Sequence, residues 1–122
     1  MQNPSQTLGV LGEELAFHYL KNRGYKILLR NYESPMGEID LIAKEKGALV
    51  FIEVKTRSSD AMGLPSEGVT AFKRHQIVKS AQYYIQRYGI DVPCRFDVVS
   101  ILIPKEGEAS VELIPDAFGE TD

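Results

Sequence analysis

The chain has 122 residues, of which 43% are hydrophobic and 25% are charged, and it contains a single cysteine. This composition is typical of one folded domain and excludes both a disordered chain and a scaffold held by disulfides. No apolar run approaches the roughly 18 residues that cross a bilayer, and no secretory signal is recognisable. We therefore expect one domain over residues 1–122, located in the cytoplasm and without a membrane partner.

The formal net charge of −3 argues against a nucleic-acid partner, but the charge is unevenly distributed. Six of the 17 acidic residues follow Pro104 with one basic residue, so we expect a core over about 5–103 and an acidic tail over about 104–122. Residues 1–104 hold 13 basic and 11 acidic groups, and residues 55–87 hold six basic and two acidic groups. This bias toward phosphate binding is modest, and on charge alone an ordinary solvated surface is the preferred explanation.

The first half of the chain predicts one helix followed by three strands. In chain order these are a helix over about 5–22 and strands over about 25–32, 37–44 and 48–57. Gly24 ends the helix, because glycine readily adopts the left-handed conformation that closes a helix. Lys46-Gly47 predicts a tight turn between the last two strands.

The second half begins with a polar segment over 58–67, whose glycine and proline predict a mobile loop. A second helix is expected over about 70–88, with apolar residues at helical spacing and a glycine after its end. Strands over about 95–103 and 111–114 complete the domain. The order αβββαββ predicts an α/β fold with a mixed β-sheet flanked by helices.

The hairpin around Lys46-Gly47 carries the most informative charged residues. With a two-residue turn, paired residues have numbers that sum to 93, so Asp40 lies opposite Glu53 and Glu38 lies opposite Lys55. A four-residue loop about the same centre gives the same pairing, whereas a three-residue loop breaks it.

Two carboxylates that face each other across a sheet repel by about 3 kcal/mol at a separation of ~5 Å and an effective dielectric near 20. A divalent cation offsets this, and Mg²⁺ prefers carboxylate and carbonyl oxygens. Asp40, Glu53 and the Val54 carbonyl would supply three ligands, and Lys55 would assist an attacking water. The alternative is a solvent-facing sheet surface on which Lys55 pairs with Glu38. The apolar neighbours of these residues weaken that alternative, because such strands are covered on both faces.

The first helix offers a further carboxylate at the edge of its apolar surface. The residues that define the core direction at 100° per residue are Leu8, Leu15 and Tyr19, with Ala16 and Leu20 to one side. Glu13 then lies at the border of the apolar surface, whereas Glu14 faces water and pairs with His18. We therefore expect Glu13, and not Glu14, to reach the site.

Asp97 alternates with Arg95 on a predicted strand. A buried structural pair of Asp97 with Arg95, or with a helix terminus, is a better explanation than a catalytic role.

A set of segments between Leu8 and Ile103 allows a comparison with known families. They are Gly12-Glu13-x-x-Ala16, Tyr19-Leu20, Gly24-Tyr25, Asn31, Gly37-Glu-Ile-Asp-Leu-Ile-Ala43, Phe51-Ile-Glu-Val-Lys55 with Arg57, and Arg95-Phe-Asp-Val-Val99. Together they resemble the bacterial YraN family, which is similar to archaeal Holliday-junction resolvases of the PD-(D/E)xK nuclease superfamily. Ile39 stands where the name of the superfamily has proline, a residue that is commonly absent there.

The resemblance implies a restriction-endonuclease-like fold and a site that binds Mg²⁺, or Mn²⁺ in its place. Asp40 and Glu53 would hold the metal, Lys55 would be catalytic, and Glu13 would orient the site or help to hold a second ion. The residues implied to meet DNA are Arg57 and Lys73.

The favoured hypothesis is a metal-dependent DNA endonuclease that hydrolyses phosphodiesters, on branched or structured DNA. One alternative is a DNA-binding or DNA-processing accessory protein that is inactive or needs a protein partner for turnover. Another is a protein-interaction scaffold that has lost catalysis. The sequence leaves open whether the protein acts as a homodimer.

Overall fold

The computed structural model describes residues 4–58 and 69–119, which form two helices and five strands in the predicted order αβββαββ. The elements are α1 (Pro4–Asn22), β1 (Lys26–Ser34), β2 (Gly37–Glu45), β3 (Ala48–Ser58), α2 (Ala71–Tyr88), β4 (Cys94–Ile103) and β5 (Ser110–Phe118). Apart from Ser58, the loop that was predicted over 58–67 lies outside the described residues.

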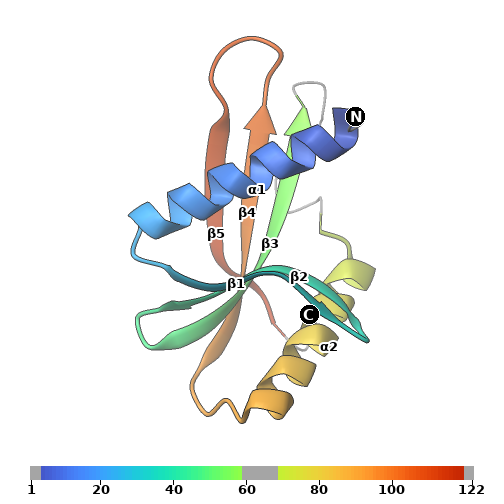
Figure 1. The fold of residues 1–122 in the computed structure, drawn as a ribbon, viewed down its shortest axis with the longest axis vertical. Helices are drawn as coiled ribbons and strands as arrows, with labels where there is room; N and C mark the ends of the chain where they lie inside the picture. Colours follow the sequence, from blue (N-terminus) through green and yellow to red (C-terminus); the bar gives the residue numbers. More distant parts are fainter. Residues whose placement is uncertain (1–3, 59–68, 120–122) are drawn as a thin grey trace.

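The strands form one mixed sheet in the order β1-β2-β3-β4-β5. The pairs β1–β2, β2–β3 and β4–β5 are antiparallel, whereas β3 and β4 are parallel. A parallel pair needs a crossover connection, and α2 lies in that connection. In Figure 1, α1 crosses over β3, β4 and β5, while α2 lies at the other end of the sheet beside β2. The α/β class with a mixed sheet and flanking helices is therefore confirmed.

The two faces of the sheet are buried by different helices. On one face α2 packs Ile77, Ala81 and Tyr84 against β-strand residues that include Phe51 and Phe96. On the other face α1 packs Ala16 and Leu20 against a second cluster, whose strand members are Leu41, Ala43, Val50, Ile52, Val99 and Ile101. Neither helix in the described parts of the chain is long and apolar enough to cross a membrane.

Small residues let α1 approach the sheet closely. Gly12, Ala16 and Leu20 are buried, and a Cβ added at Gly12 would lie 1.9 Å from Thr56 Oγ1. Leu15, which was expected to point to the core, is instead 37% exposed. The core direction of α1 is therefore rotated from Leu15 toward Ala16 and Leu20, which were expected at one side of it, because close contact through small residues outweighs the burial of the larger leucine.

The last strand is longer than the predicted 111–114. Asp116 adopts a left-handed backbone conformation with φ 49°, and the β4–β5 register shifts between Phe96 and Val98. This irregularity lets the strand continue past Pro115 to Phe118, whose ring stacks on Phe96 with centroids 5.1 Å apart. Residues 110–118 are therefore part of the sheet, and not of a separate acidic tail.

Candidate functional site

The predicted register between β2 and β3 is present, but it ends just before the two acids. The pairs run from Glu45↔Ala48 to Leu41↔Ile52, so their numbers sum to 93. Lys46 and Gly47 form the turn, both with positive φ. Asp40 and Glu53 follow directly after the last pair, at the point where the two strands separate.

Beyond this point β2 follows β1 and not β3. Glu38 is paired with Glu33 of β1, so the expected pairing of Glu38 with Lys55 does not form. Asp40 makes a different contact with β3, because its Oδ2 accepts a hydrogen bond of 2.8 Å from the Val54 amide. The carboxyl of Asp40 thereby takes the place of a strand partner.

A change of face in β2 accompanies this separation. Ile39 and Ile42 belong to the cluster beneath α2, whereas Leu41 belongs to the cluster beneath α1, so strict alternation is broken at Asp40. On β1 the residue between the flanking pairs is Asn31, which has φ 54°. A left-handed residue in a strand turns the chain locally, and asparagine tolerates this conformation better than most residues.

The strands open onto a hollow of about 580 Å³, here called the acidic hollow. Its lining residues are Leu8, Gly9, Glu13, Asp40, Glu53, Val54, Lys55, Thr56 and Lys73. It thus brings together residues of α1, β2, β3 and α2 that are far apart in the sequence. Of the residues singled out from the sequence, Arg57 is the one placed elsewhere, in a separate hollow of about 360 Å³ beside Ser100 and Glu112.

The carboxyl of Glu53 lies in the least favourable environment for a charge. Only 8% of Glu53 is exposed, and its Oε2 atom has no hydrogen-bond partner among the described residues. Burial raises its pKa to about 8, and the nearby charge of Asp40 adds to the shift. Burial also raises the pKa of Asp40, although the Val54 amide partly offsets this. Two adjacent carboxyl groups are therefore held where their joint ionisation is costly.

Lys73 of α2 interacts electrostatically with three of the acids in this region, which are Glu38, Asp40 and Glu53. Its Nζ lies 4.0 Å from Glu53 Oε2. The Lys73 ammonium partly offsets the burial that raises the pKa of Glu53, Asp40 and Glu38, whereas Lys55 acts in this way on Glu53. The sequence suggested Lys73 only as a DNA contact, because its distance from β3 depends on how α2 packs.

Glu13 and Glu14 lie in different surroundings, as the helix geometry predicted. Glu13 lines the acidic hollow, and burial followed by the charge of Asp40 raises its pKa. Glu14 is exposed, forms an ion pair with Arg30 at 2.6 Å and lies 3.7 Å from His18 Nε2.

Asn31 links Glu13 to the neighbouring strand. With its amide nitrogen facing the acids, it donates to Glu13 Oε1 at 2.9 Å and to Glu38 Oε1 at 3.2 Å. The sequence pattern contained Asn31 but assigned it no role. An asparagine in a predicted strand is the only signal that it offered, since asparagine is depleted in strands.

The donor set of the acidic hollow fits a hard cation with few protein ligands. Across residues 4–58 and 69–119, no three His, Cys, Asp or Glu side chains are arranged to hold a metal together. The oxygens that line the hollow here include the carboxylates of Asp40 and Glu53, and Val54, whose carbonyl was expected as a third ligand, lines it too. Mg²⁺ is commonly held by one or two carboxylates plus water and substrate phosphate, so this set suits Mg²⁺ or Mn²⁺.

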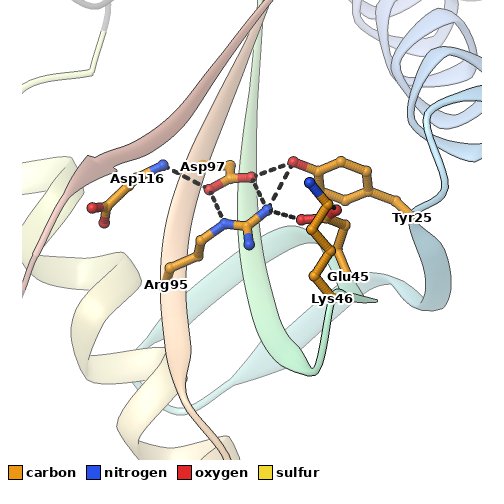
Figure 2. A network of polar contacts seen from close by, with 6 residues as sticks. All are labelled: Tyr25, Glu45, Lys46, Arg95, Asp97 and Asp116. Atoms are coloured by element: carbon orange, nitrogen blue, oxygen red, sulfur yellow. Dashed lines mark hydrogen bonds and ion pairs between the residues drawn. The ribbon is translucent and has the colours of Figure 1, made fainter.

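A second polar cluster contains the buried carboxylate of Asp97 (Figure 2). Asp97 accepts hydrogen bonds from the Tyr25 hydroxyl at 2.8 Å, from Arg95 Nε at 3.0 Å and from the Asp116 amide at 2.9 Å. Arg95 also donates to Glu45 at 2.7 Å. The predicted structural pair of Asp97 and Arg95 is therefore present, within a set of five residues called here the Arg95–Asp97 network.

Fold and site together define an α/β protein with a carboxylate-lined hollow where two antiparallel strands separate. Residues 12–101 match the model of the uncharacterised protein family UPF0102. This chain belongs to that family, which is the YraN family suggested by the sequence pattern.

Relatives in this family align over most of the chain. A UPF0102 protein of Trichlorobacter lovleyi is 45% identical over 116 residues, which cover 93% of this chain and 91% of the relative. Another, from Symbiobacterium thermophilum, is 44% identical over 115 residues, which cover 93% of this chain and 98% of the relative.

Proposed function

We propose that this protein is a metal-dependent DNA endonuclease of the PD-(D/E)xK kind, acting on branched or structured DNA. The observation that carries the proposal is the pair formed by the buried Glu53 and the half-buried Asp40, which opens onto a hollow that also holds Lys55 and Lys73. Two adjacent carboxyl groups that are largely shielded from water destabilise a fold unless a partner compensates them, and such an arrangement is typical of functional sites.

The balance of charge in the acidic hollow supports a cation there. Three acids and two lysines line it, so an added phosphate diester would meet net negative charge when all three acids are ionised. A bound Mg²⁺ or Mn²⁺ would supply the positive charge that polarises a phosphoryl oxygen. Asp40 and Glu53 would hold the cation, and Glu13 would restrict its position from the side of α1.

The remaining residues act on the phosphodiester itself. Lys55 follows Glu53 by two residues on β3 and lines the same hollow, so its ammonium can orient a water and stabilise charge on the phosphate. Arg57 follows Lys55 by two residues on β3 but lines the separate hollow beside Ser100, so it would contact DNA outside the acidic hollow. Lys73 approaches from α2 and would contact the phosphate from the opposite side.

A cleavage panel tests the proposal. Linear, nicked and four-way DNA are incubated with Mg²⁺ or Mn²⁺, and we expect metal-dependent cleavage that both Asp40→Asn and Glu53→Gln abolish. Cleavage that survives in these variants would come from a contaminant or from another site. Glu13→Ala should slow cleavage, whereas Glu14→Ala, the matched exposed acid, should remain close to wild type.

A second candidate function is a DNA-binding accessory protein without turnover. It is favoured by the small protein ligand set, because two carboxylates hold a divalent cation weakly. Binding without cleavage across the whole panel would support this candidate. Adding a partner protein to the assay then separates two cases. Cleavage that appears only with the partner indicates a nuclease that needs activation, whereas continued absence of cleavage indicates an inactive module.

DNA binding itself is measured by fluorescence anisotropy at several salt concentrations with Ca²⁺ present. Each phosphate contact contributes about −0.9 to the slope of log affinity against log salt. The double variant Arg57→Glu with Lys73→Glu should weaken binding and flatten this slope by about 2 units. Lys79→Glu, an exposed residue of α2, is the control for a general change in charge. If the wild-type protein binds no DNA at low salt, the DNA-binding hypotheses are wrong and the protein-interaction scaffold is the hypothesis that remains.

A further inference from the structure

Lys73 lies where a lysine is unfavourable for its own helix. Thr70 is the N-cap of α2, and its side chain accepts a hydrogen bond of 3.1 Å from the Lys73 amide. Lys73 is therefore the third residue of the helix, where a capping box places Glu or Gln. The first turn of α2 contains no acidic residue, so the Lys73 charge adds to the positive end of the helix.

The compensation for this position comes from outside the helix. Lys73 lines the acidic hollow, and its Nζ lies 4.0 Å from Glu53 Oε2. A residue that destabilises its own helix but stabilises a neighbouring site is typical of a functional residue. The lysine therefore serves the carboxylates of β2 and β3 more than it serves α2.

The contact between Lys73 and Glu53 is electrostatic and is not a hydrogen bond. A separation of 4.0 Å exceeds the usual hydrogen-bond range. Glu53 Oε2 has no hydrogen-bond partner in the described parts of the chain, and 40% of the Lys73 side chain is exposed. A long and partly exposed side chain held by charge alone can leave the pair without breaking a hydrogen bond.

We propose that Lys73 is the resident counter-ion of the Asp40–Glu53 pair, and that a divalent cation binds by displacing it. The inference rests on the proposed cation site of the preceding section. Lys73 repels the incoming cation, so it lowers the affinity of the site. Once displaced, its ammonium faces the open side of the hollow, where a DNA phosphate can receive it. Cation and DNA therefore strengthen each other's binding through this residue.

Calorimetric titration with Mn²⁺ measures the first consequence. Lys73→Met keeps most of the apolar stem but removes the charge, and we expect it to bind Mn²⁺ about tenfold more tightly than wild type. The matched control is Lys79→Met, an exposed lysine on the same helix, which should change the affinity by less than about twofold. Tighter binding in both variants would indicate a general effect of net charge and would overturn the proposal.

Melting of the metal-free protein in EDTA supplies an independent measurement. Lys73→Met should lower the melting temperature by about 3 °C, since 40% exposure keeps the attraction modest. In a background of Asp40→Asn with Glu53→Gln, the same change should have little effect, because no charge remains to be compensated. An equal decrease in melting temperature in both backgrounds would show that Lys73 contributes by packing, and the proposal that it is a counter-ion would be wrong.

The two proposals fail in different ways. If wild type binds Mn²⁺ and Lys73→Met binds it no more tightly, the counter-ion is wrong and the cation site stands. If no variant binds Mn²⁺, the cation site is wrong, and the melting cycle alone decides whether Lys73 compensates the acids. Binding by Lys73→Met but not by wild type would support the displacement most directly.

Discussion

The acidic hollow and the Arg95–Asp97 network each contain a buried carboxylate, but the two carboxylates differ in their hydrogen-bond partners. Asp97 is fully buried, and its two oxygens accept hydrogen bonds from a hydroxyl, a guanidinium and a backbone amide (Figure 2). Glu53 is nearly as buried, but one of its oxygens has no hydrogen-bond partner among the described residues. Its nearest partner acid, Asp40, adds repulsion.

The difference shows which buried acid serves the fold. A carboxylate with all its hydrogen bonds satisfied fixes the elements around it, and Asp97 in this way connects β4 to β5 and to Tyr25. A carboxylate that lacks partners weakens the folded state unless something outside the chain completes it. The contrast therefore separates a structural acid from one that is available to a ligand.

The largest expected effect is the loss of the structural acid. Asp97→Ala should destabilise the protein by about 4 kcal/mol, because it leaves the Arg95 guanidinium and the Tyr25 hydroxyl without their shared acceptor. Burial and the Asp97 charge raise the pKa of Tyr25 to about 12, so the hydroxyl stays a donor at neutral pH. Urea denaturation measures the change, with exposed Asp91→Ala as the control. A loss below about 1 kcal/mol would remove the contrast between the two regions.

The next effect concerns pH and the acidic hollow. The pKa of Glu53 is raised from 4.5 to about 8, so the folded protein retains a proton that the unfolded chain releases across this window. The stability of the metal-free protein should therefore fall as the pH rises from 4.5 to 8, and it should fall more steeply than that of Glu53→Gln. Denaturation in EDTA at several pH values measures this. Parallel curves for the two proteins would show that Glu53 is ionised throughout.

A smaller effect is expected where α1 meets the sheet. A methyl group at Gly12 would collide with the Thr56 side chain, so Gly12→Ala should cost about 2 kcal/mol and shift Glu13 away from the hollow. Gly9→Ala is the matched variant, because a Cβ there meets no atom within 4 Å. It should stabilise α1 by about 0.5 kcal/mol. Thermal melting of both variants provides the measurement, and equal effects would contradict the close approach.

The smallest effect on stability should come from Asp40. Asp40→Asn removes the repulsion from Glu53 while an amide oxygen can still accept from the Val54 amide. The metal-free melting temperature should stay the same or rise slightly. At a Mn²⁺ concentration 100 times its dissociation constant, wild type gains about 2.7 kcal/mol, and the variant should lose this gain. A marked loss of stability in EDTA would instead make Asp40 a structural acceptor like Asp97.

Local patterns predicted most of the elements and one decisive register. Lys46-Gly47 fixed the β2–β3 pairing, because a two-residue turn with positive φ at both positions leaves a single alignment. The angular position of Glu13 relative to Glu14 followed from helix geometry alone. These features depend on neighbours within one hairpin or one helix.

The features that were missed depend on packing between elements. The end of the β2–β3 pairing at Asp40 accompanies the turn of β1 at Asn31, which no local rule of β2 contains. Burial of Ala16 in place of Leu15 reflects how closely α1 can approach Thr56. The extension of the last strand to Phe118 depends on a contact with Phe96 of another strand, so no local pattern marks where the strand ends.

The chain connectivity of the acidic hollow has a consequence for folding kinetics. Asp40 and Glu53 lie on strands joined by a two-residue turn, and such hairpins close in about 1–10 μs. Lys73 arrives only with α2, which lies in the crossover to the parallel β3–β4 pair, and distant contacts of this kind form later. We therefore expect the carboxylates to face each other before their counter-ion is in place. A divalent cation present during refolding would neutralise this early hairpin and stabilise it before α2 docks.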